Sequence, residues 1–216
     1  MARRATTVFV ALAAADTVLA GMGRHRLRWL TKPLLMPVLM AGSDRSSRRA
    51  LAFGAAGDVA LLGSGDAAFT AGLVSFLAGH VAWITALRQR PGAGRLRSCP
   101  ALALPYLAAF GSLNAYLWQR AGKDRIPVLG YSTALLAMAL TALDSGSPRA
   151  SAGGALFMLS DSLLALEKFA GLQLPAHEGV VMATYTSAQA LLALPRDQAP
   201  GHRTRRHWPP SWSLRR

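Results

Sequence analysis

The sequence predicts an all-α, polytopic membrane bundle of eight transmembrane helices, and three observations support this fold class. Hydrophobic residues make up 52% of the 216 residues and charged residues only 16%. The mean hydropathy is positive, at +0.27. The apolar residues form long runs and most charges fall between the runs. Because a bilayer core of about 30 Å takes roughly 20 apolar residues per helix, and somewhat fewer where it thins, such runs predict membrane spans.

Eight hydrophobic segments can be followed along the chain. They cover residues 6–21, 30–42, 49–63, 67–87, 100–118, 126–143, 150–166 and 179–194. We therefore expect one transmembrane domain over residues 1–195 and a disordered, Arg- and Pro-rich cytosolic tail over residues 196–216. The second segment contains Pro33 and Pro37, which we expect to leave backbone carbonyls unpaired and to kink the helix.

Charge and cysteine content limit the possible functions. The net charge of +14 does not indicate nucleic-acid binding, because the basic residues are scattered over the loops and the tail. Cys99 is the only cysteine, which excludes an intrachain disulfide and a cysteine metal cluster. The first segment has the length of a signal peptide, but its Asp16 and the later runs favour a retained span. Lys and Arg are more frequent at both ends and in the even-numbered loops, which predicts cytosolic termini.

Two aspartates lie where a membrane helix would normally carry hydrocarbon. Asp58 is the only charge in LAFGAAGDVALLG, and Asp161 is the only charge in GALFMLSDSLLAL. A carboxylate at membrane depth costs roughly 2.5–3.5 kcal/mol, so both are functional candidates. The alternative is that each is a neutral or hydrogen-bonded packing residue, and the presence of two such residues in similar segments argues against it.

Counting along the segments places several polar side chains at a similar depth. They lie late in odd-numbered segments or early in even-numbered ones: Asp16, Lys32, Asp58, Asn114, Tyr131, Asp161 and Tyr185. His80 and Gln189 are expected to lie deeper. A polar layer in one leaflet predicts a water-accessible pocket that opens towards one membrane face. Unrelated interfacial anchors would explain the tyrosines but not the aspartates.

The segments that carry the two aspartates also resemble each other. Each has a phenylalanine, then a small residue directly before the aspartate, then two leucines. The same direction of both helices fits a parallel duplication of four-helix halves, with the acids meeting near the pseudo-axis.

Five sequence blocks point to a known family. They are KPLLMP starting at Lys32, the Gly57–Asp58 pair with its following leucines, AFTAGLVSFLAGH ending at His80, GALFMLSDSLLALEKF, and VMATYTSAQALLAL. In this order and spacing they resemble the lysoplasmalogenase family of YhhN-like or TMEM86-like membrane proteins, over residues 30–194. The resemblance implies that residues 1–195 form a catalytic domain that needs no metal or other cofactor. It also implies a lysophospholipid substrate in a bilayer, cleaved at its vinyl-ether bond to a fatty aldehyde and glycerophosphoethanolamine or glycerophosphocholine.

The resemblance implies that Asp58 and Asp161 are the catalytic pair, and the chemistry suits them. A vinyl ether reacts when a proton reaches its alkene carbon, which gives an oxocarbenium ion that water captures. Such an enzyme needs one protonated acid and one carboxylate, as glycosidases do for a related cation. Burial and a second nearby carboxylate favour the neutral form of one acid. We expect Asp161 to be the acid and Asp58 the carboxylate, although the sequence fits the reverse assignment too.

Further residues are expected to bind or position the substrate. Lys32 is a candidate for the substrate phosphate, or else a snorkelling anchor. Tyr131, Tyr185 and Asn114 are candidates for positioning the acids or the water, or else for interhelical hydrogen bonding.

His80 is expected near the substrate. It could form a zinc site with both aspartates, but its depth and the lack of a second suitable histidine predict no metal. Gln189 is expected to link helices, and Asp16 is a third candidate acid.

Two other classes of function remain open from the sequence. A transporter or lipid flippase would use the paired aspartates to bind a proton or cation. A structural membrane protein is the third class. The Arg- and Ala-rich, Lys-poor composition indicates a GC-rich bacterial genome and hence a bacterial plasma membrane.

Overall fold

The computed structural model describes residues 2–90, 92 and 94–194, and every regular element in this part of the chain is helical. The predicted tail, residues 196–216, lies outside the described residues. The long helices are α1 (Ala2–Gly21), α2 (His25–Ala41), α3 (Arg45–Ala60), α4 (Asp66–Arg88), α6 (Leu104–Leu117), α7 (Arg125–Asp144), α8 (Pro148–Ala170) and α9 (His177–Ala193). Each corresponds to one predicted segment, so the all-α fold is confirmed. A short helix, α5 (Arg95–Ser98), and 3-10 turns at Pro100–Ala103 and Gly122–Asp124 lie in the connections.

Helix ends differ from the ends of the hydrophobic runs because capping groups set them. Helix α3 begins at Arg45, four residues before its predicted start, and the Asp44 side chain accepts a hydrogen bond from the Ser47 amide at 2.8 Å. Helix α8 continues past the apolar run to Ala170 and ends at Gly171, whose φ of 65° suits glycine. Helix α2 is continuous through Pro33 and Pro37.

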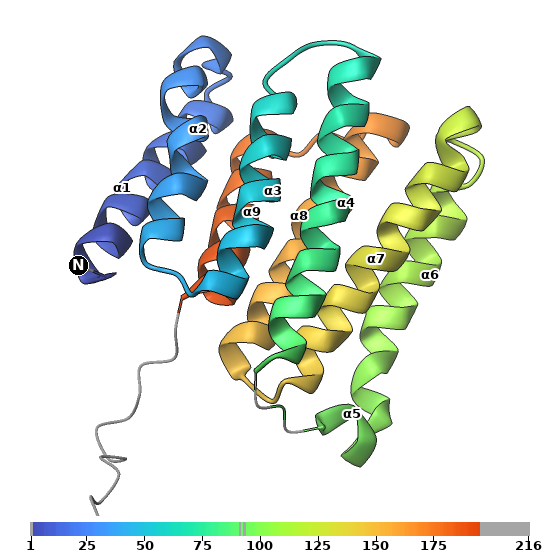
Figure 1. Cartoon of the computed structure of the whole chain (residues 1–216). Coiled ribbons are helices and arrows are strands. Elements are labelled where there is room, and N and C mark those ends of the chain that lie inside the picture. The colour runs from blue at the N-terminus through green and yellow to red at the C-terminus, as the bar shows by residue number, and fades with distance from the viewer. Residues whose placement is uncertain (1, 91, 93, 195–216) are drawn as a thin grey trace, which may run out of the picture.

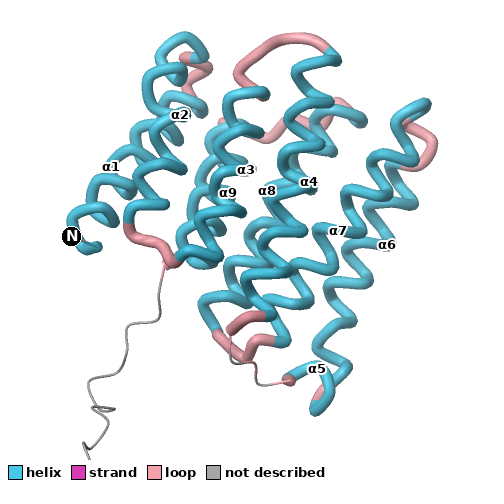
Figure 2. Tube along the Cα trace, viewed as in Figure 1, coloured by secondary structure: helices cyan, strands magenta, loops and turns pink. Residues whose placement is uncertain are grey.

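The helices form a flattened ring (Figures 1 and 2). Helices α1, α2, α3, α4, α7, α8 and α9 follow one another around it, and contact between α1 and α9 closes the ring. Helices α2, α3 and α4 form one layer, while α1, α9 and α8 form the other. Helix α6 lies outside the ring against α7. Both ends of the described chain lie at one end of the bundle, and the α3–α4 connection lies at the other.

Small residues bring α8 close to both of its neighbours. A Cβ on Gly154 would lie 3.1 Å from the Ala139 Cα of α7, and a Cβ on Gly153 would lie 3.1 Å from the Ala188 carbonyl of α9. Helices in membranes associate through such close backbone contact. The position of Asp161 on α8 is therefore fixed from two sides.

The outer surface suits a lipid environment. Large apolar side chains such as Leu30 (70% exposed), Leu104 (62%) and Ile126 (61%) face outwards. Three stretches in the described chain, Arg4–Gly21, Asp66–Arg88 and Gly122–Asp144, are long and apolar enough to cross a membrane. These features indicate an integral membrane protein.

Candidate active site

Asp58 of α3 and Asp161 of α8 line the same cavity, which has a volume of about 400 Å³. Lys32 of α2, Tyr131 of α7 and Tyr185 of α9 line it as well. Gly63 of the α3–α4 connection also contributes, which places the cavity towards the end of the bundle opposite the two chain ends. The structure thus brings five of the predicted site residues together.

Asp58 is buried and paired with a cation. Its side chain is 2% exposed, and its Oδ1 atom lies 3.5 Å from the Lys32 ammonium. The Tyr185 hydroxyl donates to Oδ2 at 2.9 Å. Gln189 donates to the Tyr185 oxygen and accepts from the Trp83 indole, both at 3.2 Å. Burial of this side chain disfavours its charged form, whereas the Lys32 cation and the Tyr185 hydroxyl favour it.

The glycine before Asp58 makes room for the Phe76 ring. A Cβ on Gly57 would lie 2.7 Å from the Phe76 ring, closer than atoms can pack. Phe76 in turn lies edge-on to the Tyr185 ring. Glycine is therefore required here so that the Phe76 ring can close the wall of the cavity.

Asp161 has different partners. The Tyr131 hydroxyl donates to its Oδ2 atom at 2.5 Å. His80 Nε2 lies 3.0 Å from the Tyr131 oxygen and 3.4 Å from the same Oδ2 atom. The His80 Nδ1 atom has no hydrogen-bond partner among the described residues, which fits the tautomer that carries its proton on Nε2 and donates to Tyr131. The Asp161 side chain is 11% exposed, so it reaches the cavity more freely than Asp58 does.

The two acids are held in a crosswise manner. Asp58 of α3 pairs with Lys32 of the preceding helix, α2, and accepts a hydrogen bond from Tyr185 of α9. Helices α1 to α4 form the first half of the chain, and α9 is the last helix of the second half. Asp161 takes Tyr131 from its preceding helix, and His80 comes from α4, the last helix of the first half. A parallel duplication of four-helix halves would produce this exchange of partners.

The other predicted residues do not line this cavity. Asn114 accepts a hydrogen bond from Ser132 of α7 at 3.0 Å, which links α6 to α7. Asp16 is fully buried and accepts from Thr31 at 2.6 Å. His80, expected to lie deeper than the acids, is nevertheless in contact with one of them. Gln189 links α4 and α9, as its predicted role requires.

Two charged residues of the cavity were not predicted. Arg28 is 8% exposed at its side chain and donates to Glu178 at 2.7 Å, and both residues line the cavity. The Arg28 Nε atom has no partner in the described part of the chain. Arg28 precedes Lys32 by four positions, so both face one side of α2. This spacing is visible in the sequence, but the apolar run begins only at Leu30.

The arrangement of side chains does not support a zinc site formed by His80 and the two aspartates. No group of three or more His, Cys, Asp or Glu side chains among the described residues is arranged to hold a metal ion. Asp58 faces Lys32 instead of His80. The donors near Asp161 are a phenol and one imidazole, which suit proton transfer better than metal binding.

Comparison with known proteins identifies the family. The sequence model of the YhhN family matches residues 27–196, a range that contains both acids and their partners Lys32, His80, Tyr131 and Tyr185. The chain belongs to the YhhN family.

Curated relatives of this YhhN-family chain carry a functional name. Lysoplasmalogenase TMEM86B of Homo sapiens is 34% identical over 156 residues, which cover 72% of this chain and 65% of the human protein. Lysoplasmalogenase TMEM86B of Sus scrofa is 36% identical over 162 residues, covering 74% of this chain and 68% of the pig protein. The chain thus spans about two thirds of the length of these relatives. No solved structure matches it.

Proposed function

We propose that this protein is a membrane lysoplasmalogenase that hydrolyses the vinyl-ether bond of a lysophospholipid by acid–base catalysis of Asp161 and Asp58. The observation that carries the proposal is the shared cavity with its two unlike acids: one is paired with a cation, and the other is held by a phenol. The name of the curated relatives supports the choice of reaction.

The partners of each acid suggest its role. Asp58 lies beside the Lys32 ammonium, which favours a carboxylate, so it is the group that stabilises a cation. Asp161 receives its contacts from Tyr131 and His80 on Oδ2, and we assign the proton that it transfers to Oδ1. The hydrogen bond from Tyr131 stabilises the carboxylate that Asp161 becomes when the proton leaves.

The reaction balances with these two groups and one water molecule. Asp161 gives its proton to the alkene carbon remote from the ether oxygen, and the oxocarbenium ion forms beside the Asp58 carboxylate. Water adds to the cationic carbon and loses a proton to Asp58, which gives a hemiacetal. The hemiacetal hydroxyl returns a proton to Asp161, and the proton on Asp58 passes to the leaving ether oxygen. The products are the aldehyde and the glycerol alcohol, with both acids restored. General acid catalysis of this kind contributes about 10²–10⁴-fold.

The charged part of the cavity suits the head group. Lys32 and Arg28 lie on one side of α2, and both line the cavity. A lysophospholipid carries one phosphate, which Arg and Lys side chains bind through charge-assisted hydrogen bonds. We assign the phosphate to these two cations, within reach of the acids.

We also propose how the protein lies in the membrane. All eight long helices cross the bilayer. At 1.5 Å per residue, α2, α3 and α9, with 16 or 17 residues, reach about 25 Å, and α6, with 14 residues, reaches about 21 Å. A locally thinned membrane accommodates such helices. The positive-inside rule places both chain ends in the cytosol of a bacterial cell. The cavity then opens on the outer face of the plasma membrane.

The test uses the purified full chain in detergent and a hexadecenyl lysoplasmalogen. Native protein should release hexadecanal, and in deuterated water the aldehyde should carry deuterium on the carbon next to the carbonyl. Asp161→Asn and Asp58→Asn should each lower kcat by about 100-fold or more. Asp66→Asn is the matched control, because the Asp66 side chain is 83% exposed and lies outside the cavity, and it should retain full activity.

Full activity in both Asp161→Asn and Asp58→Asn would rule out the mechanism. If the native protein releases no aldehyde, but proteoliposomes show uptake or flipping coupled to a proton gradient, the alternative transport function replaces the hydrolase.

A further inference from the structure

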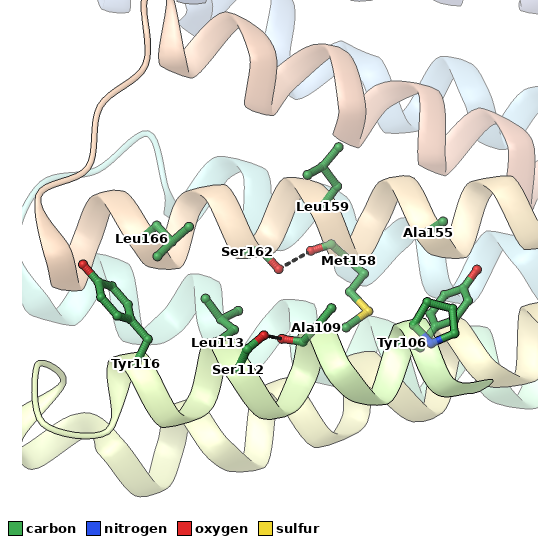
Figure 3. A pocket seen from close by; sticks show the side chains of 11 residues that line it. Tyr106, Ala109, Ser112, Leu113, Tyr116, Ala155, Met158, Leu159, Ser162 and Leu166 are labelled. Carbon is green, nitrogen blue, oxygen red and sulfur yellow. Dashed lines mark hydrogen bonds between the residues drawn. The ribbon is translucent and has the colours of Figure 1, made fainter. Parts of the chain in front are cut away.

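An open apolar groove runs between α6 and α8 on the outside of the ring (Figure 3). Its volume is about 650 Å³, within the usual range for a small-molecule site. Leu113 of α6 faces Leu166 and Met158 of α8 across it. Its two serine hydroxyls donate to backbone carbonyls of their own helices, Ser112 to Ala108 at 2.7 Å and Ser162 to Met158 at 2.6 Å. Most of the groove therefore offers hydrocarbon without unmet hydrogen bonds.

A narrow space shares lining residues with both this groove and the polar cavity. Five residues line both this narrow space and the polar cavity: Leu61, Phe76, Tyr131, Asp161 and Leu164. Two residues, Leu113 and Ser162, line both the narrow space and the groove. We call this space the neck. Its volume of about 60 Å³ is that of about two water molecules, so it admits a thin chain and little else.

The order of these spaces matches the order of groups in a single-chain lipid. The polar cavity contains Arg28 and Lys32, the neck begins at Asp161, and the groove opens on the lipid-facing outside. A molecule with one charged end and one alkyl chain can occupy all three at once. The bond at its junction would then lie beside Asp161.

We propose that the neck and the groove bind the alkenyl chain of the substrate, and that the chain enters from the bilayer between α6 and α8. This inference rests on the proposed function, because it assigns the substrate's chain to a path that starts at the catalytic acid. Helix α6 lies outside the ring, against α7, and the groove between α6 and α8 opens on the outside of the ring. The chain thereby presents its vinyl ether to Asp161 while the head group remains with the cations.

Substitutions along the path test this inference through chain length. Ser162→Phe should close the junction of neck and groove, since its hydroxyl serves only its own helix backbone. We expect hydrolysis of a hexadecenyl substrate to fall about tenfold or more, and that of a butenyl substrate, which ends within the neck, to remain near native. The matched control is Thr133→Phe, an exposed residue of α7 whose hydroxyl likewise donates to its own helix, at 2.7 Å.

A second pair of variants probes the groove itself. Ala155→Trp fills the groove from α8, whereas Ala152→Trp places the same ring on an exposed face of α8 outside it. The first should lower activity on the hexadecenyl substrate, and the second should not. Equal chain-length profiles for Ser162→Phe, Ala155→Trp and the native protein would overturn the inference while leaving the proposed function standing.

A binding experiment tests the chain path even if the native protein is not an enzyme. The probe is a saturated alkyl-ether lysophospholipid with a diazirine at the chain end, which cannot be hydrolysed. After photolysis, the label should be found by mass spectrometry on α6 and α8 beside the groove, and Ser162→Phe should remove it from there. Label on other outer helix faces, or label unchanged by Ser162→Phe, would overturn the chain path whether or not the native protein is an enzyme.

Discussion

Helices α3 and α8 hold equivalent aspartates in unlike surroundings. Asp58 of α3 is held by a lysine and a tyrosine, and it lines the polar cavity but not the neck. Asp161 of α8 is held by a tyrosine and a histidine, and it lines both the polar cavity and the neck. Under the proposed mechanism, this difference makes one aspartate the acid and the other the base: the preceding helix supplies a cation to Asp58 and a phenol to Asp161.

The largest expected difference between the two aspartates concerns the stability of their asparagine variants. Asp58→Asn leaves the buried Lys32 charge without its partner, which costs about 3 kcal/mol in comparable pairs. Asp161→Asn keeps an oxygen that accepts from Tyr131, so its cost should be about 1 kcal/mol or less. Thermal unfolding in detergent should therefore show a much lower Tm for Asp58→Asn.

A double variant sharpens this prediction. Lys32→Met together with Asp58→Asn removes both charges, so the Tm should recover while the activity stays low. A similar loss of Tm in Asp161→Asn and Asp58→Asn, or no recovery in the double variant, would show that the Lys32 ion pair does not distinguish the two sites.

The tyrosines provide the next comparison. Tyr131→Phe removes the hydroxyl that stabilises the Asp161 carboxylate after proton transfer, so we expect kcat to fall by about 10- to 100-fold. Tyr185→Phe leaves Asp58 with Lys32, and the fall should be less than about tenfold. Steady-state kinetics with one substrate would measure both. A larger effect of Tyr185→Phe would reverse the assignment of acid and carboxylate.

The smallest expected difference lies at the beginnings of the two helices. Asp44 caps α3 and Ser147 caps α8. Burial acts to raise the pKa of Asp44, but hydrogen bonds with Ser46 and Ser47 and the charge of Arg90 outweigh it, so the pKa lies below its usual value of 3.8. Its contribution to stability is therefore complete above pH 3.8 and is lost as the pH falls through the lower, folded-state value.

Alanine variants of Asp44 and Ser147 would detect the pH-dependent contribution of the Asp44 carboxylate to stability. Each should lower the free energy of unfolding by about 1 kcal/mol or less at neutral pH. The loss caused by Asp44→Ala should be well below about 1 kcal/mol, because the Asp44 side chain is 45% exposed and its charge is screened by solvent. The effect of Asp44→Ala on Tm should disappear in acid, whereas that of Ser147→Ala should not. Equal pH dependence for the two variants would contradict the role given to the Asp44 carboxylate.

The sequence was sufficient for the eight long helices because each contains an apolar run. It was less informative about their ends, since the helical turn at the start of α3 is polar and depends on the Asp44 cap. The short helix α5 carries no periodic signal, and it follows Gly94 in the left-handed conformation.

Depth counting predicted the layer that contains Lys32, Asp58, Tyr131, Asp161 and Tyr185, because depth depends only on position along a helix. It could not predict which residues meet, because that depends on how the helices are arranged around the ring. His80, which was expected to lie deeper than the acids, contacts Asp161, and Asn114 lines the neck with Asp161 but not the polar cavity. Arg28 was missed because the prediction followed hydrophobicity, and α2 begins with a charged turn.

The hydrogen bond between Tyr185 and Asp58 joins positions 127 residues apart. During synthesis, Asp58 emerges long before α9 exists, so its phenol partner arrives only when α9 packs against α3. A chain that stops short of α9 would leave that carboxyl group incompletely satisfied in the bundle. Completion of the site is thus tied to the arrival of α9.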